Sequence, residues 1–183
     1  SWVMGDRLGG AGGDHIAKVK IEGTIVEDEE LLKRLERIAE ADRVKGVILW
    51  VNSPGGTTAG GEALYEAVRK LAGEKPVVAQ VGTLAASAGY MIASAADHVV
   101  ARQSSIVGSI GVLMQYPDVT GLMEMAGVKL EGVKSSPLKA EPSPFSPTTD
   151  EERAMIRALV MDSYDWFVGL VEERRPLSRA EAL

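Results

Sequence analysis

Hydrophobic and polar positions follow two different periods along the first half of the chain. Residues 16–21 alternate apolar and polar side chains, which predicts a strand with one polar face. Residues 28–41 instead carry apolar side chains three and four positions apart, the pattern of an amphipathic helix. The same reasoning predicts further strands at 47–51, 77–81 and 98–101 and further helices at 59–71 and 87–96. This order predicts repeated β-α-β units and therefore an α/β fold with a mostly parallel sheet.

The second half of the chain has a less regular pattern. Residues 134–147 are polar and interrupted by prolines, which predicts a long loop of the kind that is often functional. A capping box formed by Thr149 and Glu152 predicts the start of a long helix. The apolar pattern predicts strands at 110–114 and 128–133 and a short helix between them at 119–125. It predicts that the long helix covers residues 149–173. With no internal repeat in the sequence, the whole pattern predicts a single domain.

The composition is that of an ordinary globular domain, and it narrows the chemistry. The 183 residues are 45% hydrophobic and 25% charged, and their net charge of −6 argues against a nucleic-acid partner. The sequence has no cysteine, which excludes a thiol nucleophile, a cysteine zinc site and a disulfide. Its 2 histidines are His15, which follows a glycine-rich segment, and His98, which begins a predicted strand. Neither context is typical of a catalytic base, and lysine is the usual substitute for histidine beside a nucleophile.

The two ends of the sequence differ from the rest. Residues 1–14 are glycine-rich and aperiodic, and we interpret them as a linker or an engineered remnant. Residues 177–183 resemble the start of a helix, with Ser178 as N-cap and Glu181 at the third helical position. The expected domain therefore covers residues 15–183 and is truncated at its C-terminus. No apolar run approaches the ~18 residues of a membrane-spanning helix.

A glycine-rich segment follows the predicted buried strand at 47–51. It reads Asn-Ser-Pro-Gly-Gly at 52–56, at the carboxyl end of a strand, where α/β folds place their sites. Glycines at such a position let main-chain N–H groups approach a ligand and stabilise an oxyanion. An ordinary tight turn between strand and helix explains the segment equally well. A phosphate loop is not favoured, because the Gly-Lys-Ser/Thr sequence is missing.

Ser87 lies at the predicted start of the buried helix 87–96, among small residues. Its hydroxyl would lie at a helix N-terminus, whose dipole favours a developing negative charge, and a substrate backbone could come close. A plain N-cap serine is the simpler interpretation of this motif alone. The Gly-x-Ser-x-Gly pattern of a nucleophile elbow is not met, because Ala85 occupies the position of the first glycine.

Lys139 and Ser109 complete the candidate chemistry. Lys139 lies in the predicted loop, where a solvated surface lysine is the simpler interpretation, but the sequence offers no better base for a serine nucleophile. A lysine buried beside a serine is more easily neutral, because desolvation disfavours the ammonium form, and it can then accept the serine proton. Ser109 stands between Gly108 and Ile110 and could orient the lysine amine, although a turn serine is favoured on sequence alone.

Four segments, taken together in their order and spacing, resemble the signal peptide peptidase A (SppA, protease IV) family of serine peptidases. They are Asn-Ser-Pro-Gly-Gly at 52–56, Ala-Ala-Ser-Ala-Gly-Tyr at 85–90, Val-Gly-Ser-Ile-Gly-Val at 107–112 and the Lys139 loop leading to residues 144–153. The first segment alone also occurs in ClpP-type peptidases, which share the wider crotonase-like fold. The resemblance covers about residues 15–180 and implies a ClpP/crotonase-like architecture for the predicted α/β domain.

The resemblance implies a Ser–Lys dyad in which Ser87 is the nucleophile and Lys139 the general base. It also implies that the Ser109 hydroxyl positions the lysine. The oxyanion hole would be formed by the main-chain N–H groups of Gly55 and Ala88.

Two positions depart from the pattern that is common in this family. Ala88 replaces the first glycine of Ser-Gly-Gly-Tyr, but alanine still offers its N–H group, so we expect little loss. The loop that commonly reads Gly-Lys-Tyr-Lys reads Ser-Pro-Leu-Lys at 136–139. Because of this second departure, Lys134 is a fallback candidate for the base.

The resemblance implies a serine endopeptidase that degrades signal peptides and other unfolded, apolar polypeptides through an acyl-enzyme, without a cofactor or metal. It also implies a homo-oligomer anchored in a membrane by a segment absent from this chain, with the catalytic domain on the extracytoplasmic side. One alternative is a stomatin-cleaving membrane protease of the same clan. Another is a crotonase-type acyl-CoA enzyme, for which Glu62 is the main acidic group near the two motifs. A third is an assembly module that keeps the fold without turnover.

Overall fold

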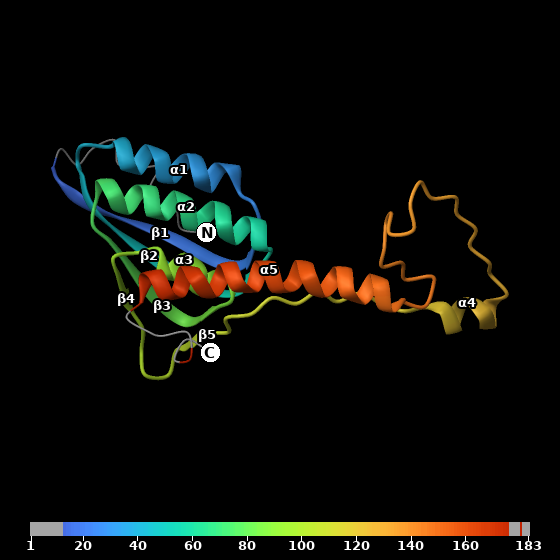
Figure 1. The fold of residues 1–183 in the computed structure, drawn as a ribbon. Helices are drawn as coiled ribbons and strands as arrows, with labels where there is room; N and C mark the ends of the chain where they lie inside the picture. The colour runs from blue at the N-terminus through green and yellow to red at the C-terminus, as the bar shows by residue number, and fades with distance from the viewer. Residues whose placement is uncertain (1–12, 176–179, 181–183) are drawn as a thin grey trace. The chain divides into compact units, whose positions relative to one another are not determined.

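The computed structural model describes residues 13–175 and residue 180 as alternating strands and helices followed by two further helices (Figure 1). In chain order the elements are β1 (His15–Ile25), α1 (Glu29–Glu40), β2 (Val44–Gly56), α2 (Thr58–Glu74), β3 (Val77–Ala86), α3 (Ala88–Ser94), β4 (His98–Val100), β5 (Ile106–Gly108), α4 (Thr120–Ala126) and α5 (Asp150–Arg174).

The strands form one parallel sheet. Its order is β1-β2-β3-β4, and β5 also pairs with β3, beyond the part of β3 that pairs with β4. Every pairing in the sheet is parallel, from β1 with β2 through β3 with β5. Since parallel strands need a crossover between them, α1 and α2 connect β1 to β2 and β2 to β3. The expected α/β fold with a mostly parallel sheet is confirmed.

The hydrophobic core lies between this sheet and its helices. Figure 1 shows α1 and α2 side by side along one face of the sheet. Alternate residues of β1 and β3 point into the core, whereas the central strand β2 is almost continuously covered from Val47 to Ser53. The largest fully buried apolar side chains are Phe167, Leu35, Leu49, Leu71, Ile92, Val19, Val51, Val68, Val77, Val168 and Val171.

Side-chain caps set where three of the helices begin, and Thr57 supplies the one at the start of α2. The Asp28 carboxylate accepts a hydrogen bond from the Leu31 N–H at 3.0 Å at the start of α1. The predicted capping box of α5 is confirmed, because the Thr149 N–H donates to the Glu152 carboxylate at 2.9 Å and the Glu152 N–H donates to the Thr149 hydroxyl at 3.2 Å.

Contacts divide the chain into two compact units. The first contains the residues up to Gly111 and those from Trp166 onward, and the second is Val112–Asp165. The core described above belongs to the first unit, to which α5 contributes its C-terminal part. Within the second unit Glu152 is the only residue that is buried as a whole, and Glu141 buries its side chain while its main chain stays partly exposed. Among the residues that the structure describes, no helix is both long enough and apolar enough to cross a membrane.

Two strand predictions are wrong. Residues 110–114 and 128–133 form no strand, and the strand in this region is β5 at 106–108. A strand forms only where another strand pairs with it, and an apolar run in the sequence does not show whether such a partner exists. Leu113 and Leu130, from the two segments, are 73% and 64% exposed. The predictions for residues 1–14 and for the helix start at 177–183 fall outside the described residues, except at residues 13, 14 and 180.

Candidate active site

Ser87 occupies a sharp turn between β3 and α3. Its φ and ψ are 51° and −124°, a conformation that is rare for any residue other than glycine. The Ser87 side chain makes no capping hydrogen bond to α3, so the interpretation as a plain N-cap serine is not supported. Strained backbone of this kind is typical of functional sites, and a strand-to-helix turn that exposes a serine hydroxyl is the geometry of a nucleophile elbow. Ser87 has this geometry although the sequence lacks the elbow's first glycine.

The end of β5 holds the Ser87 main chain in this conformation. The Ser87 N–H donates to the Gly108 carbonyl at 2.9 Å, while the Ser87 carbonyl accepts from the Met91 N–H within the first turn of α3. Gly108 and Ser109 both have positive φ values, of 105° and 53°. The Gly108-Ser109 segment is therefore linked to Ser87 through the main-chain carbonyl of Gly108. The Ser109 side chain itself is exposed.

Gly55 packs directly against the Ser87 side chain. A Cβ atom on Gly55 would lie 2.7 Å from the Ser87 Cβ and 3.2 Å from its Oγ, and the φ of Gly55 is +110°. Both the close approach and the backbone angle require glycine. Residues 52–56 continue β2 as a strand, so the interpretation as a tight turn is not supported and the glycine segment lies beside Ser87.

Ser53 connects the same segment to β1. It is fully buried, its hydroxyl donates to the Gly23 carbonyl at 2.7 Å, and its oxygen accepts from the Gly55 N–H at 3.1 Å. The Gly55 N–H, which the family resemblance assigns to an oxyanion hole, is thus bonded to Ser53 in this structure. Sequence reasoning missed this role, although a serine inside a buried apolar strand is a usable signal for a structural hydrogen bond.

Asn52 is a second residue that the sequence did not single out. Its side-chain oxygen accepts hydrogen bonds from the N–H groups of Thr83 and Leu84 at 3.1 and 3.2 Å. These bonds lie where the register between β2 and β3 shifts, between Val51 and Ser53. Asn52 therefore satisfies strand N–H groups that the shifted ladder leaves unpaired, just before β3 reaches Ser87.

The departure at Ala88 is accommodated by a glycine on α2. Ala88 is buried, and its methyl group lies 3.0 Å from the position that a Cβ on Gly61 would take. A methyl group therefore fits at residue 88 because residue 61 has none. As the first residue of α3, Ala88 has an N–H group without an acceptor inside the helix.

Neither histidine lies near Ser87 within the first unit. His98 pairs with Val78, and β3 runs from there to Ala86 over about 26 Å at the usual rise of a strand. His15 pairs with Val44, and β2 runs from there to Gly55 over about 35 Å. The expectation that no histidine is placed to act on Ser87 is therefore confirmed in this part of the chain.

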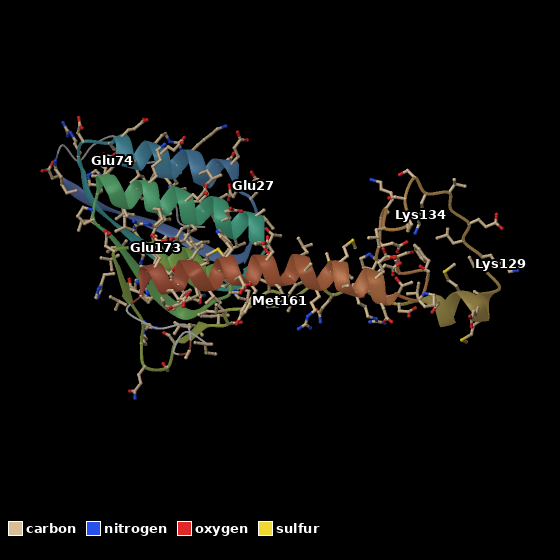
Figure 2. All side chains as sticks on the ribbon, in the orientation of Figure 1. Glu27, Glu74, Lys129, Lys134, Met161 and Glu173 are labelled. Carbon is tan, nitrogen blue, oxygen red and sulfur yellow. The ribbon has the colours of Figure 1, made fainter. Side chains whose placement is uncertain are left out.

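The two lysine candidates lie in the second unit, on the long loop between α4 and α5. Lys139 is exposed, and its N–H donates to the Ser136 carbonyl at 3.1 Å. Lys134, labelled in Figure 2, forms an ion pair with Glu141. The pairing of Lys139 with Ser87 stays a prediction, as do the roles of Ser109, Gly55 and Ala88.

The described residues contain no group of three or more side chains that could hold a metal ion. What the first unit offers is a serine hydroxyl at a helix start, next to main-chain N–H groups and glycines. This arrangement suits nucleophilic attack on a carbonyl with main-chain stabilisation of the oxyanion.

Comparison with known families agrees with this geometry. The profile of peptidase family S49 matches residues 69–182, and that of Clp protease matches residues 18–107. The chain belongs to peptidase family S49. The S49 match includes α3 with Ser87 and the loop with both lysines, and the Clp match includes the glycine segment at 52–56 and Ser87. The expected resemblance to the SppA family and the ClpP-like architecture are confirmed.

The similarity of this S49 chain to individual proteins extends over most of its length. A Methanocaldococcus jannaschii protein named as a protease is 38% identical over 96% of the chain and 61% of its own length. Protease 4 of Haemophilus influenzae is 35% identical over 91% of the chain and 28% of its own. The chloroplastic serine protease SPPA of Arabidopsis thaliana is 30% identical over 92% of the chain and 25% of its own. The chain thus spans between a quarter and about three fifths of these relatives.

Proposed function

We propose that the chain is the catalytic part of a serine endopeptidase that cleaves signal peptides and other unfolded, apolar polypeptides. The observation that carries this proposal is the Ser87 turn, with a positive φ of 51° and a hydroxyl that makes no capping bond. Membership of family S49 and the SPPA name of one relative support the substrate class. A partly exposed serine at the start of a buried helix is accessible to a peptide carbonyl.

The reaction proceeds through an acyl-enzyme. Lys139, in its neutral form, takes the proton of the Ser87 hydroxyl as the Oγ atom attacks the scissile carbonyl carbon. The tetrahedral intermediate collapses, the C–N bond breaks, and the leaving amine takes that proton from the lysine ammonium. The Lys139 amine then takes a proton from water, which attacks the ester carbonyl carbon. As the ester C–O bond breaks, the lysine ammonium returns this proton to the Ser87 Oγ atom and the acid product leaves. The Ser109 hydroxyl orients the lysine amine.

Main-chain N–H groups of Gly55 and Ala88 stabilise the oxyanion in this proposal. The Ala88 N–H is available at the start of α3, where the helix dipole also favours negative charge. The Gly55 N–H becomes a donor to the oxyanion when it turns away from the Ser53 hydroxyl, which accepts it at 3.1 Å in the structure. Removal of one such donor typically costs about 10²–10³ in rate.

We further propose that the protein works as a homo-oligomer at a membrane. The second unit exposes many large apolar side chains and none of its apolar residues is buried, which suits contact with further copies. Attachment would come from a segment outside this sequence, with the catalytic domain on the extracytoplasmic side, as in the family that the chain resembles.

Two substitutions test the dyad. Ser87→Ala and Lys139→Met are each expected to reduce cleavage of an unfolded apolar peptide to background, because one removes the nucleophile and the other its base. The measurement is peptide turnover together with labelling of Ser87 by a fluorophosphonate probe.

Lys129→Met is the matched control, because Lys129 is also an exposed lysine of the second unit. This variant should retain the parent turnover. Full turnover in either Ser87→Ala or Lys139→Met would show that the dyad assignment is wrong.

A further inference from the structure

A carboxylate is buried in the loop that carries Lys139. The Glu141 side chain is 2% exposed and forms an ion pair with the Lys134 ammonium, which is 40% exposed. One Glu141 oxygen also accepts a hydrogen bond from the Ser143 N–H at 2.6 Å. A carboxylate removed from water in this way needs such partners, so the pair is a structural requirement of the loop and not a free surface contact.

The Lys134–Glu141 pair closes the loop around Lys139. Residues 134–141 contain no helix or strand. The hydrogen bonds within this segment are two turn bonds, from the Lys139 N–H to the Ser136 carbonyl at 3.1 Å and from the Glu141 N–H to the Leu138 carbonyl at 3.4 Å. Turn bonds of this kind do not fix the course of a loop. The ion pair links the first residue of this stretch to the last, and Lys139 lies between them.

The loop is then tied to the rest of the second unit directly after Glu141. The Phe145 N–H donates to the Ser143 hydroxyl at 3.2 Å, and the Pro144 carbonyl accepts from the Val119 N–H at 2.9 Å, next to the start of α4. Through its ion pair, the Glu141 carboxylate therefore links Lys134, at the start of the loop, to residues 143–145, which are bonded to the rest of the second unit.

We propose that Glu141 is a positioning residue, which holds Lys139 in the place from which it acts on Ser87 by binding Lys134. This inference rests on the proposed Ser–Lys function. It also assigns different roles to the two lysines. Lys134 donates its N–H groups to a carboxylate, whereas a general base must offer a lone pair, so Lys134 is the tether and Lys139 the base.

The expected consequence is a loss of reaction rate that depends on Lys139. A reacting group displaced by about 1 Å can cost about 10²-fold in rate. Glu141→Gln and Lys134→Met should therefore each slow fluorophosphonate labelling of Ser87 by about 10²-fold. Turnover of an apolar peptide should fall mainly in kcat, because the loop change affects the base and leaves the main-chain cradle around Ser87 intact.

The decisive experiment is a double-mutant cycle with Lys139→Ala. If Glu141 acts through Lys139, then Glu141→Gln slows labelling in the parent chain and has no further effect in the Lys139→Ala background. A second variant, Lys134→Glu combined with Glu141→Lys, keeps the pair with exchanged charges and should recover part of the lost rate. Glu131→Gln and Lys129→Met are matched controls, since both residues are exposed on the same segment (Lys129 is labelled in Figure 2).

Each outcome separates this inference from the function on which it rests. Parent-like labelling in Glu141→Gln overturns the positioning role, while a slow Lys139→Ala variant leaves the dyad in place. Equal slowing by Glu141→Gln in both backgrounds also overturns it, because the effect then does not pass through Lys139. Parent-like labelling in Lys139→Ala shows instead that the proposed base is wrong.

Discussion

Ser53 supports the candidate site from inside the core with a single hydroxyl. It donates to the Gly23 carbonyl and accepts from the Gly55 N–H, so Ser53→Ala leaves two main-chain groups without their partner. We expect this variant to lose about 2 kcal/mol in the free energy of unfolding, as is usual for buried groups left unsatisfied. Urea denaturation measures the loss. Ser104→Ala, at an exposed serine, should stay close to the parent.

Gly55 is constrained by its neighbour as well as by its backbone. Gly55→Ala would bring a methyl group to 2.7 Å from the Ser87 Cβ at a φ of +110°. Gly108→Ala meets a similar φ of +105° but has no atom within 4 Å of its new methyl group. Both variants should lose about 1–3 kcal/mol in stability through backbone strain. Only Gly55→Ala displaces the Ser87 side chain, so its fluorophosphonate labelling should fall further than that of Gly108→Ala; equal labelling would contradict the close packing.

The sequence could predict which residue types form the site but not the conformation that makes Ser87 reactive. The sequence alone shows the Asn-Ser-Pro-Gly-Gly motif and the small residues around Ser87. The φ of Ser87 depends on the carbonyl of Gly108 and on the missing Cβ of Gly55, and both come from distant parts of the chain. The choice between an N-cap serine and a nucleophile elbow therefore needed tertiary structure.

At the scale of elements, α3 is held at its C-terminal end by two arginines. Arg174 of α5 donates to the carbonyls of Ser94 and Ala96, both at 3.3 Å, and Arg69 of α2 donates to the Ala95 carbonyl at 3.2 Å. Guanidinium groups are favourable there because they satisfy the last carbonyls of the helix and complement its dipole. These contacts fix the helix that begins beside Ser87.

Arg174→Met should therefore loosen α3. We expect a loss of about 2 kcal/mol in the free energy of unfolding, since hydrogen bonds to charged groups contribute more than neutral ones. Hydrogen exchange should become faster for the amides of α3 in particular. Arg157→Met is the control, because Arg157 is an exposed arginine of the same helix. Unchanged exchange in α3 would mean that the arginine contacts do not hold this helix.

The elements of the first unit were predictable because their patterns coincide with a partner in the sheet or the core. The expected strands at 47–51 and 77–81 lie inside β2 and β3, which extend further toward the site. The strands expected at 110–114 and 128–133 failed for the opposite reason. Ile110 packs against the core, but most of the large apolar side chains that follow it in these two segments are exposed. A sequence pattern cannot show whether another strand is available for pairing.

At the scale of the whole molecule, Tyr65 links the stability of the fold to pH. Tyr65 is 7% exposed. Burial raises its pKa above the ordinary value of 10.0, and the Glu173 carboxylate adds to the shift. The positive charges of Arg69, Arg174 and Arg175 oppose it. Because the unfolded chain loses this proton first, stability is fully present below about pH 10 and is lost as the pH rises through the folded pKa.

Tyr65→Phe should remove this contribution to the alkaline loss of stability. Urea denaturation between about pH 8 and pH 11 should show a parent chain that weakens more steeply than the variant above about pH 10. Tyr116→Phe is the control, because Tyr116 is only partly buried. Parallel curves for the parent and Tyr65→Phe would contradict the buried tyrosine as the cause.

The second unit gives the last prediction, which concerns assembly. Met125 is 87% exposed and Val133 fully so, and nearby Leu122 and Leu130 are also well exposed. Such side chains stay exposed at a cost unless another surface covers them, and burial of one large apolar side chain contributes about 1.5–3 kcal/mol. Since about 1.4 kcal/mol is a tenfold change in affinity, Met125→Glu should weaken the proposed homo-oligomer by about 10-fold or more.

Sedimentation velocity over a range of protein concentrations measures this change. Ile16→Glu is the matched control, because Ile16 is 63% exposed on β1 in the first unit. If the second unit forms the contact, Met125→Glu shifts the chain to smaller species and Ile16→Glu leaves the assembly unchanged. The reverse result would place the contact on the sheet edge of the first unit, and a parent chain that stays monomeric at all concentrations would contradict self-association through this segment.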